Sequence, residues 1–275
     1  MIAAGADELS LPDRFRRDGF ARFPGFLGPT RIATLRAACD AALAGWQKAE
    51  GRGSRAPDVT NMAFLTDLRL WPGDRAGLLQ IAEFAASSAV LALVERAAGA
   101  PALFHNTQYF MEPHTRTWDG DWHRDTQFLA HTDDIEWARI RSSAGVHFRV
   151  ALVDDPWFEI VPGSQARWDT AEEYAIRRST DAVTRRGPMP GGQAVPLRAG
   201  DALLFHAWAI HRGRYSAQRP RRTLDIVYSM GAPNDWGVPT PGSFSEPAVL
   251  DALSPGARAF YDRFVHAYMP FWNRR

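Results

Sequence analysis

The chain has 275 residues, of which 45% are hydrophobic and 23% charged, a composition typical of a folded protein with a sizeable core. Lys and Arg number 32 against 31 for Asp and Glu, so a net charge of +1 gives no reason to expect nucleic acid or a membrane as the main partner. We therefore expect a small-molecule partner. The single cysteine, Cys39, excludes an intrachain disulfide and a thiol-rich zinc site, so any metal must use His and carboxylate ligands.

The first hundred residues are predicted to be mainly helical. One helix starts at Pro29 or Thr30, and residues 73–99 predict one or two Ala- and Leu-rich helices that end at Gly99 and Pro101. The N-terminus lacks the basic start and apolar run of a signal peptide. No stretch approaches the uninterrupted apolar length of a membrane helix, so we expect a cytoplasmic protein.

After Pro101 the sequence changes in composition to aromatic and β-branched runs bounded by Gly, Pro and Asp, which predict strands. These runs are LFHNTQYFMEP, IEWARIRSS, GVHFRVALVD, WFEIVPGS, AVPLRAGDALLFHAW and RRTLDIVYSMG. Helical spacing returns at about 169–178 and 254–269. A helical lead-in followed by eight or so antiparallel strands predicts a mainly β fold with helical decorations. The specific expectation is a double-stranded β-helix, of the jelly-roll or cupin-like class, with the N-terminal helices packed on one face.

We expect residues 1–275 to form a single domain. Its parts are a helical lead-in over about 1–100, a jelly-roll core over 101–231 and a C-terminal extension over 232–275.

The most informative motif is the pair His123 and Asp125, followed far downstream by His211. Two imidazoles and one carboxylate can cap one face of an octahedral metal and leave the other face open, as in non-haem Fe(II) oxygenases. On an extended strand, positions i and i+2 point to the same side. These three residues are therefore the predicted metal ligands and catalytic centre.

Other histidines compete for these roles. His131 and Asp133 have the same spacing as the first pair, but they lie in a polar cluster typical of a solvated turn, whereas Trp122 leads into His123. For the distant ligand, His206 lies within an apolar strand, while His211 ends that strand and meets a basic, Gly-containing turn. The mouth of a barrel would lie there, which favours His211.

Four motifs in order resemble the phytanoyl-CoA dioxygenase-like family of Fe(II)- and 2-oxoglutarate-dependent oxygenases. They are the lead-in RRDGFARFPGFL, the metal motif WHRD, the turn IVPGSQ and the strand AGDALLFHAWAIHRG. The resemblance extends over most of the chain. Two positions depart from the family pattern: Gln165 stands where His is usual, and Gly213 stands where Ser is common. We therefore expect the hydroxyl contact to the co-substrate to be missing or to come from another residue.

The resemblance implies Fe(II), 2-oxoglutarate as co-substrate and O2, with an Arg that binds the far carboxylate of 2-oxoglutarate. The planar guanidinium suits this because it can donate two parallel hydrogen bonds. Arg221 and Arg222 are both candidates, and they face opposite sides of a strand expected to pair with the His211 strand. Arg222 lies eleven residues after His211 (222 − 211 = 11), an offset common in such enzymes. The residues around Arg221, however, resemble the family pattern for this arginine, so we prefer Arg221. Gln108 is a further candidate, since an amide beside Asn106 could bind a co-substrate carboxylate.

The implied activity is hydroxylation of an unactivated C–H bond of a small molecule, with release of succinate and CO2. Asp125 favours this outcome because related halogenases replace the carboxylate ligand with a small residue. The alternatives are desaturation or ring formation, a cupin-like metalloenzyme that does not use 2-oxoglutarate, and a non-catalytic metal-binding module. Gln127 is expected to face the metal, and three arginines beside the ligands are candidates for binding an anionic group: Arg124, Arg212 and Arg214. Four tryptophans are candidates for the lining of a substrate pocket: Trp118, Trp157, Trp208 and Trp236.

Overall fold

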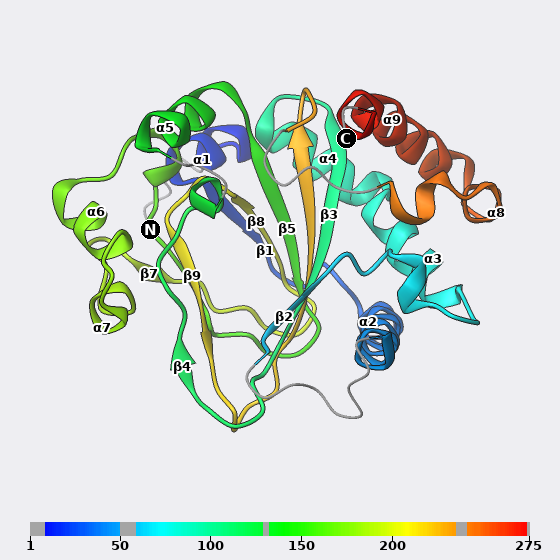
Figure 1. Ribbon diagram of the computed structural model, residues 1–275, viewed down its shortest axis with the longest axis horizontal. Helices are drawn as coiled ribbons and strands as arrows, with labels where there is room; N and C mark the ends of the chain where they lie inside the picture. Colours follow the sequence, from blue (N-terminus) through cyan, green and yellow to red (C-terminus); the bar gives the residue numbers. More distant parts are fainter. Residues whose placement is uncertain (1–8, 50–58, 129–131, 235–240, 274–275) are drawn as a thin grey trace, which may run out of the picture.

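In the part of the chain that the structure describes, ten strands form two antiparallel sheets that face each other, with helices on the outer side of the larger sheet (Figure 1). The computed structural model describes residues 9–49, 59–128, 132–234 and 241–273. His131 and Trp236 lie outside these residues. The larger sheet has the order β1-β8-β5-β10-β3-β2 and the smaller one the order β4-β9-β6-β7. This arrangement confirms the predicted double-stranded β-helix with helical decorations.

The strands are β1 (Phe20–Phe23), β2 (Asn61–Ala63), β3 (Ala102–Met111), β4 (Trp118–Asp119), β5 (Gly145–Ala151), β6 (Phe158–Ile160), β7 (Gln193–Ala194), β8 (Ala202–His206), β9 (His211–Tyr215) and β10 (Arg222–Met230). The α-helices are α1 (Leu11–Asp18), α2 (Pro29–Ala49), α3 (Ala76–Ala85), α4 (Ser88–Ala98), α5 (Asp133–Ser142), α6 (Ala171–Arg177), α7 (Ala182–Arg185), α8 (Pro247–Leu250) and α9 (Pro255–Trp272). Short 3-10 turns occur at η1 (Leu68–Leu70), η2 (Asp125–Phe128), η3 (Ser164–Ala166) and η4 (Gly242–Ser245).

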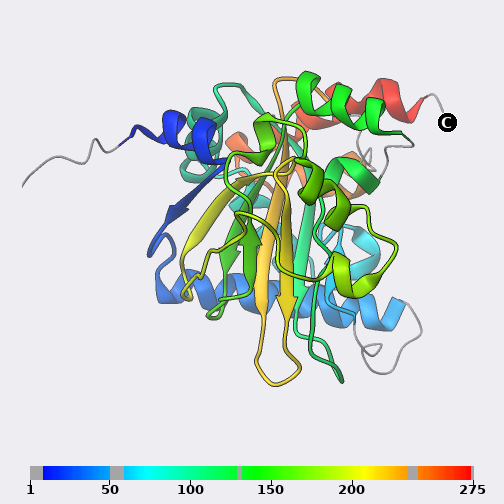
Figure 2. The ribbon, with the colours of Figure 1, turned by 90° about the vertical axis from the view of Figure 1, so that its left-hand side faces the viewer.

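The two faces of the larger sheet have different chemistry. Side chains at alternate positions, such as Leu224, Ile226 and Tyr228 of β10, point outward into the main hydrophobic core. Helices α2, α3, α4 and α9 cover that face, as Figures 1 and 2 show. Several positions of the opposite parity, such as Thr223 and Asp225 of β10, are polar and buried. Because strand residues alternate between faces, these polar side chains point between the two sheets.

Local signals explain several helix boundaries. Ser10 caps α1 by accepting the Asp13 N–H, and Gly19 ends the helix with a φ of 79°, a left-handed conformation that glycine adopts without steric cost. Thr170 and Glu173 form a reciprocal capping box at the start of α6, so this helix matches the prediction for residues 169–178.

One predicted strand is wrong. IEWARIRSS belongs to helix α5, whose N-cap Thr132 accepts the Ile135 N–H. Asp133, which was expected in a solvated turn, lies in the first turn of this helix together with other acidic residues. An N-cap followed by acidic residues stabilises a helix through its N–H groups and dipole, and this outweighs the β propensity of Ile and Trp.

The expectation that no stretch has the length of a membrane helix is also wrong. Residues Ala76–Ala98 are long and apolar enough, by length and composition, to cross a membrane. The chain divides this stretch into α3 and α4, with Ala86 and Ser87 between them. Buried side chains of both helices, including Ile81 and Val90, belong to the main core.

Candidate metal centre

His123, Asp125 and His211 come together between the two sheets. Their ligand atoms all lie within 4.8 Å of one another. Asp125 Oδ1 is 3.6 Å from His123 Nε2 and 3.7 Å from His211 Nε2. Asp125 and His211 are buried, and His123 is partly exposed. Two imidazole nitrogens and one carboxylate oxygen that converge in this way form the donor set that Fe(II) uses in facial-triad oxygenases.

Backbone pairing brings the two histidines together. His123 donates its N–H to the carbonyl of His211 at 3.0 Å and accepts the His211 N–H at 2.9 Å, as an isolated bridge. His211 is the first residue of β9, so it does not end the preceding strand as predicted. Asp125 begins the 3-10 turn η2, so the ligand pair is not on a regular strand either.

The orientation of both imidazoles fits a metal bound through Nε2. His123 Nδ1 lies 2.8 Å from the carbonyl of Asp121, and His211 Nδ1 lies 2.9 Å from the carbonyl of Ala209. Each Nδ1 therefore carries the proton, and each Nε2 keeps a free lone pair directed at the ligand cluster. Metal-binding histidines are usually held by such a bond on the other ring nitrogen.

The second oxygen of Asp125 has a different partner. His147 Nε2 lies 2.9 Å from Asp125 Oδ2, and His147 Nδ1 lies 3.2 Å from Asp225 Oδ2. Burial opposes ionisation of Asp125, but the hydrogen bond from His147 and the surrounding imidazoles hold the pKa of Asp125 below its usual range. Burial likewise disfavours the charged form of His147, yet its bonds to Asp125 and Asp225 raise the pKa of His147 to about 8.

Of the two candidate arginines, only Arg221 faces the space between the sheets. Arg221 is 1% exposed, contacts Asp155 at 3.3 Å and lies over the rings of Phe110 and Tyr215. Arg222 points to the opposite face, where it pairs with Glu112 and lies 3.2 Å from Asp40 of helix α2. The structure therefore does not bring Arg222 to the metal centre.

The strand that carries these arginines also pairs differently from the expectation. β10 lies between β3 and β5 in the larger sheet, while the His211 strand, β9, belongs to the smaller sheet. Arg221 therefore reaches the His211 strand across the interior and not along a sheet. Its Nη1 lies 3.4 Å from the carbonyl of Arg214 in β9.

Gln108 faces the interior from β3. It stands opposite Asp225 in the β3–β10 pairing, and Asp225 in turn stands opposite Arg149 in the β10–β5 pairing, so the three form one row. Gln108 Oε1 accepts a hydrogen bond from Asn61 Nδ2 at 3.4 Å. Asn106 uses its Oδ1 to accept the backbone N–H of Phe64.

Both departures from the family pattern have a structural counterpart. A side chain at Gly213 would place its Cβ 2.9 Å from Arg221 Nη1 and 2.8 Å from the Tyr215 hydroxyl, so the space of the usual serine is filled by these groups. Gln165 donates its amide to the Arg16 carbonyl at the end of α1. It links the turn after β6 to the N-terminal helix, away from the three ligands.

Several candidates for contact with the metal or with an anionic substrate group have structural partners instead. Arg124 is fully buried and donates to Asp169 and to the carbonyls of Ser164 and Trp208. Gln127 accepts hydrogen bonds from Arg177 Nη1 and from the backbone N–H of Arg124, so it does not face the metal as predicted. This is because the chain turns into η2 and no longer alternates after Asp125.

Arg212, Arg214 and Trp208 follow the same pattern, whereas Trp157 lines a cavity that is separate from the three ligands. Arg212 pairs with Glu159 at 2.5 Å and Arg214 with Asp119 at 2.7 Å. Trp208 is buried and donates its indole N–H to the Ser143 carbonyl at 2.7 Å. The rival ligand His206 is partly buried, with its ring 6.2 Å from that of Phe15, and is not part of the ligand cluster.

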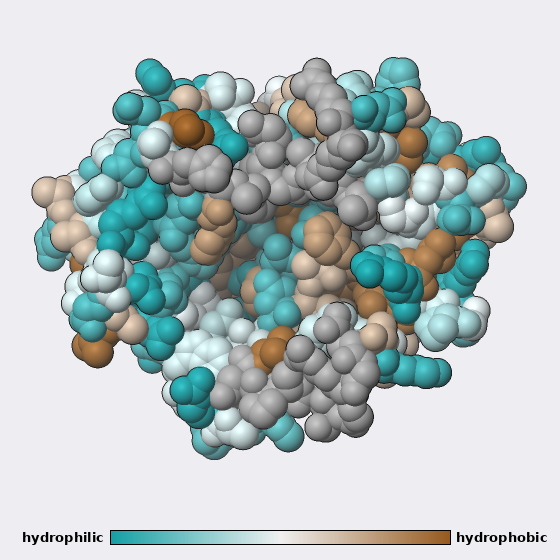
Figure 3. Space-filling model, in the orientation of Figure 1, coloured by the Kyte–Doolittle hydropathy of each residue, from teal (hydrophilic) through white to brown (hydrophobic). Residues whose placement is uncertain are grey.

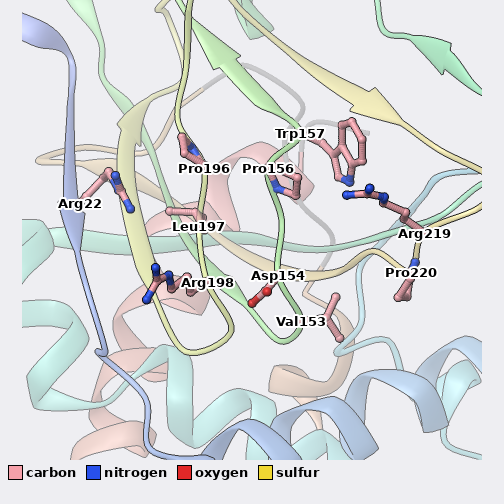
Figure 4. A pocket seen from close by; sticks show the side chains of 10 residues that line it. All are labelled: Arg22, Val153, Asp154, Pro156, Trp157, Pro196, Leu197, Arg198, Arg219 and Pro220. Carbon is pink, nitrogen blue, oxygen red and sulfur yellow. The ribbon is translucent and has the colours of Figure 1, made fainter.

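Figure 3 shows a hollow in the middle of one face, between β9 and β3 of Figure 1. A separate cavity of ≈ 640 Å³ lies under the loops that connect β5 to β6, β7 to β8 and β9 to β10. Arg22, Arg198 and Arg219 surround it, with Asp154 as its acidic residue (Figure 4). None of the three candidate metal ligands lines this cavity, so its size is no indication of the reaction site.

Sequence reasoning missed His147, Arg149 and Asp225, which lie directly behind Asp125. The available signal was the alternation of His147 and Arg149 with apolar residues in GVHFRVA, which indicates a strand with one polar, buried face. Their contact with Asp225 depends on the β5–β10 pairing, which the local pattern does not contain.

Residues 15–223 match the profile of the family described as phytanoyl-CoA dioxygenase. No curated protein matches the chain. Among solved structures, the non-haem α-ketoglutarate-dependent carbocyclase SnoK from nogalamycin biosynthesis is 22% identical, with a TM-score of 0.59 over 91% of this chain and 93% of its own. The epimerase SnoN, in complex with Fe3+, α-ketoglutarate and nogalamycin RO, is 24% identical, with a TM-score of 0.56 over 81% and 82%. EctD from S. alaskensis, with 2-oxoglutarate and 5-hydroxyectoine, is 17% identical, with a TM-score of 0.55 over 83% and 79%.

Proposed function

The chain belongs to the phytanoyl-CoA dioxygenase family of non-haem Fe(II)- and 2-oxoglutarate-dependent oxygenases, and from this premise we propose that it hydroxylates an unactivated C–H bond of a small molecule. His123, Asp125 and His211 hold Fe(II) in this proposal. The observation that carries it is the convergence of these three ligand groups within 4.8 Å, with both imidazole Nδ1 atoms already held by carbonyls. When bound, Fe(II) and 2-oxoglutarate supply the O2 activation that inserts one oxygen atom into the substrate, with succinate and CO2 as the other products.

The residues around the site have separate roles. Asp125 stays ionised and offers one oxygen to the metal. Arg221 binds the far carboxylate of 2-oxoglutarate, because it is the candidate arginine that faces the interior and it shares the Phe110 ring with Arg149. Arg149 supports an anion here, since its Nη1 is buried without a hydrogen-bond partner among the described residues. Gln108 offers an amide nitrogen in the same row as Arg149.

The substrate in this proposal has an apolar part that lies next to the metal. Phe128 is 64% exposed, and its ring centroid is 5.2 Å from that of His123. A large exposed aromatic beside a ligand cluster marks a surface that a ligand can cover. Ion pairs already occupy the nearby arginines Arg212 and Arg214, which favours a substrate without an anionic group at that position.

A second candidate reaction leaves no new oxygen atom in the product, as epimerisation or ring formation would. The solved relatives described as an epimerase and a carbocyclase depend on α-ketoglutarate and share the fold, which keeps this outcome open to test. The product mass separates these reactions, because hydroxylation adds one oxygen atom, ring formation removes two hydrogen atoms and epimerisation leaves the mass unchanged. Epimerisation also needs two electrons from a reductant such as ascorbate, which the reaction mixture supplies.

The experiment supplies Fe(II), 2-oxoglutarate, isotope-labelled O2 and a panel of small apolar substrates. Hydroxylation predicts substrate-stimulated succinate and one labelled oxygen in the product. Succinate with an unlabelled product would favour the second candidate, with unchanged mass for epimerisation and a loss of two hydrogen atoms for ring formation. No stimulation by any member of a broad panel would count against both candidates.

A further inference from the structure

A buried chain of hydrogen bonds runs from Arg149 through Asp225 and His147 to Asp125. We propose that this chain positions Asp125 so that Oδ1 alone faces the metal, which keeps the carboxylate a one-oxygen ligand and leaves the open metal face free. The proposal rests on the assignment of Asp125 as a ligand in the proposed function. It gives His147, Asp225 and Arg149 the role of positioning residues.

The two oxygens of Asp125 have separate partners. Oδ1 lies 3.6 and 3.7 Å from the Nε2 atoms of His123 and His211, which places it toward the shared metal position. Oδ2 lies 2.9 Å from His147 Nε2. A carboxylate group rotates easily about its terminal torsion, so without this partner both oxygens could turn toward the metal. A chelating carboxylate would occupy one more coordination position.

The end of the hydrogen-bond chain that is farthest from Asp125 is held rigidly. Arg149 donates from Nε and Nη2 to the two oxygens of Asp225, both at 2.7 Å, in a bidentate pair. The register makes this pair possible, since Asp225 and Arg149 are direct cross-strand partners in β10 and β5. The side chain of Asp225 has no exposed surface, and those of His147 and Arg149 are each 4% exposed. Water therefore competes little for these bonds.

Aromatic rings fix the two basic side chains. The His147 ring stacks on Phe205, with centroids 4.6 Å apart and an interplanar angle of 21°. The guanidinium of Arg149 lies 4.6 Å from the ring centre of Phe158 and 5.1 Å from that of Phe205. Because Phe158 and Phe205 also contact the His211 ring, the chain and the metal ligands share one packed interior.

The test measures Co(II) binding to the folded, metal-free protein, with the Co(II) absorption spectrum as a report on coordination. We expect His147→Leu to weaken Co(II) binding roughly 10- to 100-fold and to change the spectrum, which is the usual effect of removing a partner of a ligand. His147→Gln should largely restore both, because its amide nitrogen can reach the place of Nε2. His206→Leu removes a histidine outside the ligand cluster and should keep the wild-type affinity and spectrum.

A folded His147→Leu protein with wild-type Co(II) affinity and spectrum would overturn the proposal. If His147→Leu does not fold, His147→Gln and His147→Asn decide the question. Gln places its nitrogen near the position of Nε2, toward Asp125, and Asn near the position of Nδ1, toward Asp225. Only Gln should keep the wild-type values, so equal values for the two variants would contradict the proposal.

These outcomes are separate from those of the proposed function. A wild-type protein that binds Co(II) in the expected way but shows no turnover with 2-oxoglutarate would contradict the reaction and leave the positioning role intact. A wild-type protein that binds no metal would contradict both.

Discussion

His123 and His211 bind each other through their backbones, with N–H to carbonyl distances of 3.0 and 2.9 Å in the two directions. The bridge joins the segment after β4 to the first residue of β9. It holds the two imidazoles with ring centroids 4.3 Å apart. Chain pairing therefore fixes the position of the two imidazoles relative to each other.

Removal of a metal ligand should weaken metal binding without unfolding the protein. We expect His211→Ala to lower Fe(II) affinity by more than about 100-fold, a larger loss than for a residue that only supports a ligand. The β-sheet content should stay the same, because the backbone bridge does not use the side chain. Circular dichroism and metal titration without oxygen measure the two effects. Loss of the fold together with the metal would show that metal binding organises this region.

Substitutions of Arg221, which precedes β10, and of Arg222, which begins it, should have different effects on 2-oxoglutarate binding. We expect Arg221→Met to weaken 2-oxoglutarate binding roughly 10- to 100-fold, the value of one or two charge-assisted hydrogen bonds. Arg222→Met removes the same group from the outer face and should leave that affinity unchanged. The measurement is 2-oxoglutarate titration of metal-loaded protein without oxygen.

The same pair can be tested with a second ligand. 2-Oxopentanoate has a methyl group in place of the far carboxylate, so it should bind wild type and Arg221→Met equally. A large effect of Arg222→Met on 2-oxoglutarate, with none of Arg221→Met, would reverse the assignment.

Gly213 should resist any side chain. A Cβ there meets Arg221 Nη1 at 2.9 Å and the Tyr215 hydroxyl at 2.8 Å, so we expect Gly213→Ala to cost about 1–3 kcal/mol of unfolding free energy. It should also weaken 2-oxoglutarate binding by displacing Arg221. Gly256→Ala in α9 is the matched control, because a Cβ there contacts nothing within 4 Å. Denaturant unfolding of the two variants gives the comparison, and equal stabilities would show that the interior yields easily.

Acid should remove a contact between β8 and the N-terminal segment. Burial opposes ionisation of Asp201, but hydrogen bonds from the backbone N–H groups of Arg198 and Gly25 and the charge of Arg22 hold the pKa of Asp201 below its usual value of 3.8. The folded state thus binds this proton more weakly than the unfolded state does. The resulting stability is present above pH 3.8 and is lost as the pH falls below it through the folded pKa.

Asp201→Asn isolates this effect. We expect the variant to be less stable than wild type at neutral pH and to lose less stability on acidification below pH 3.8. Thermal unfolding across that range measures the difference. Parallel loss in both proteins would mean that other carboxylates carry the acid sensitivity.

The sequence predicted the fold class and the types of ligand from local patterns. The aromatic and β-branched runs after Pro101 indicated an antiparallel β core, and the structure confirms it. The spacing of His123 and Asp125 suggested a metal site, and the family match supports the implied Fe(II) and 2-oxoglutarate. The assignment of each residue to its role stays a prediction until the variants above are measured.

Local patterns failed where a cap or a turn changed the backbone. Thr132 starts helix α5 within a segment predicted as a strand, and the 3-10 turn at Asp125 directs Gln127 away from the metal. An alternation with a period of two residues predicts which way side chains point only where the backbone is extended.

The sequence by itself determined the types of metal ligand and excluded a thiolate site. It also provided two adjacent arginines, Arg221 and Arg222, as candidates for binding an anion. Only the tertiary structure decided that Arg221 faces inward, that Gly213 leaves room for it and that Asp125 is bound from behind by His147. Side-chain alternation is a property of one strand and can be read along the chain. Which interior side chains meet depends on the register between strands far apart in sequence, and that register is set by the packing of the whole domain.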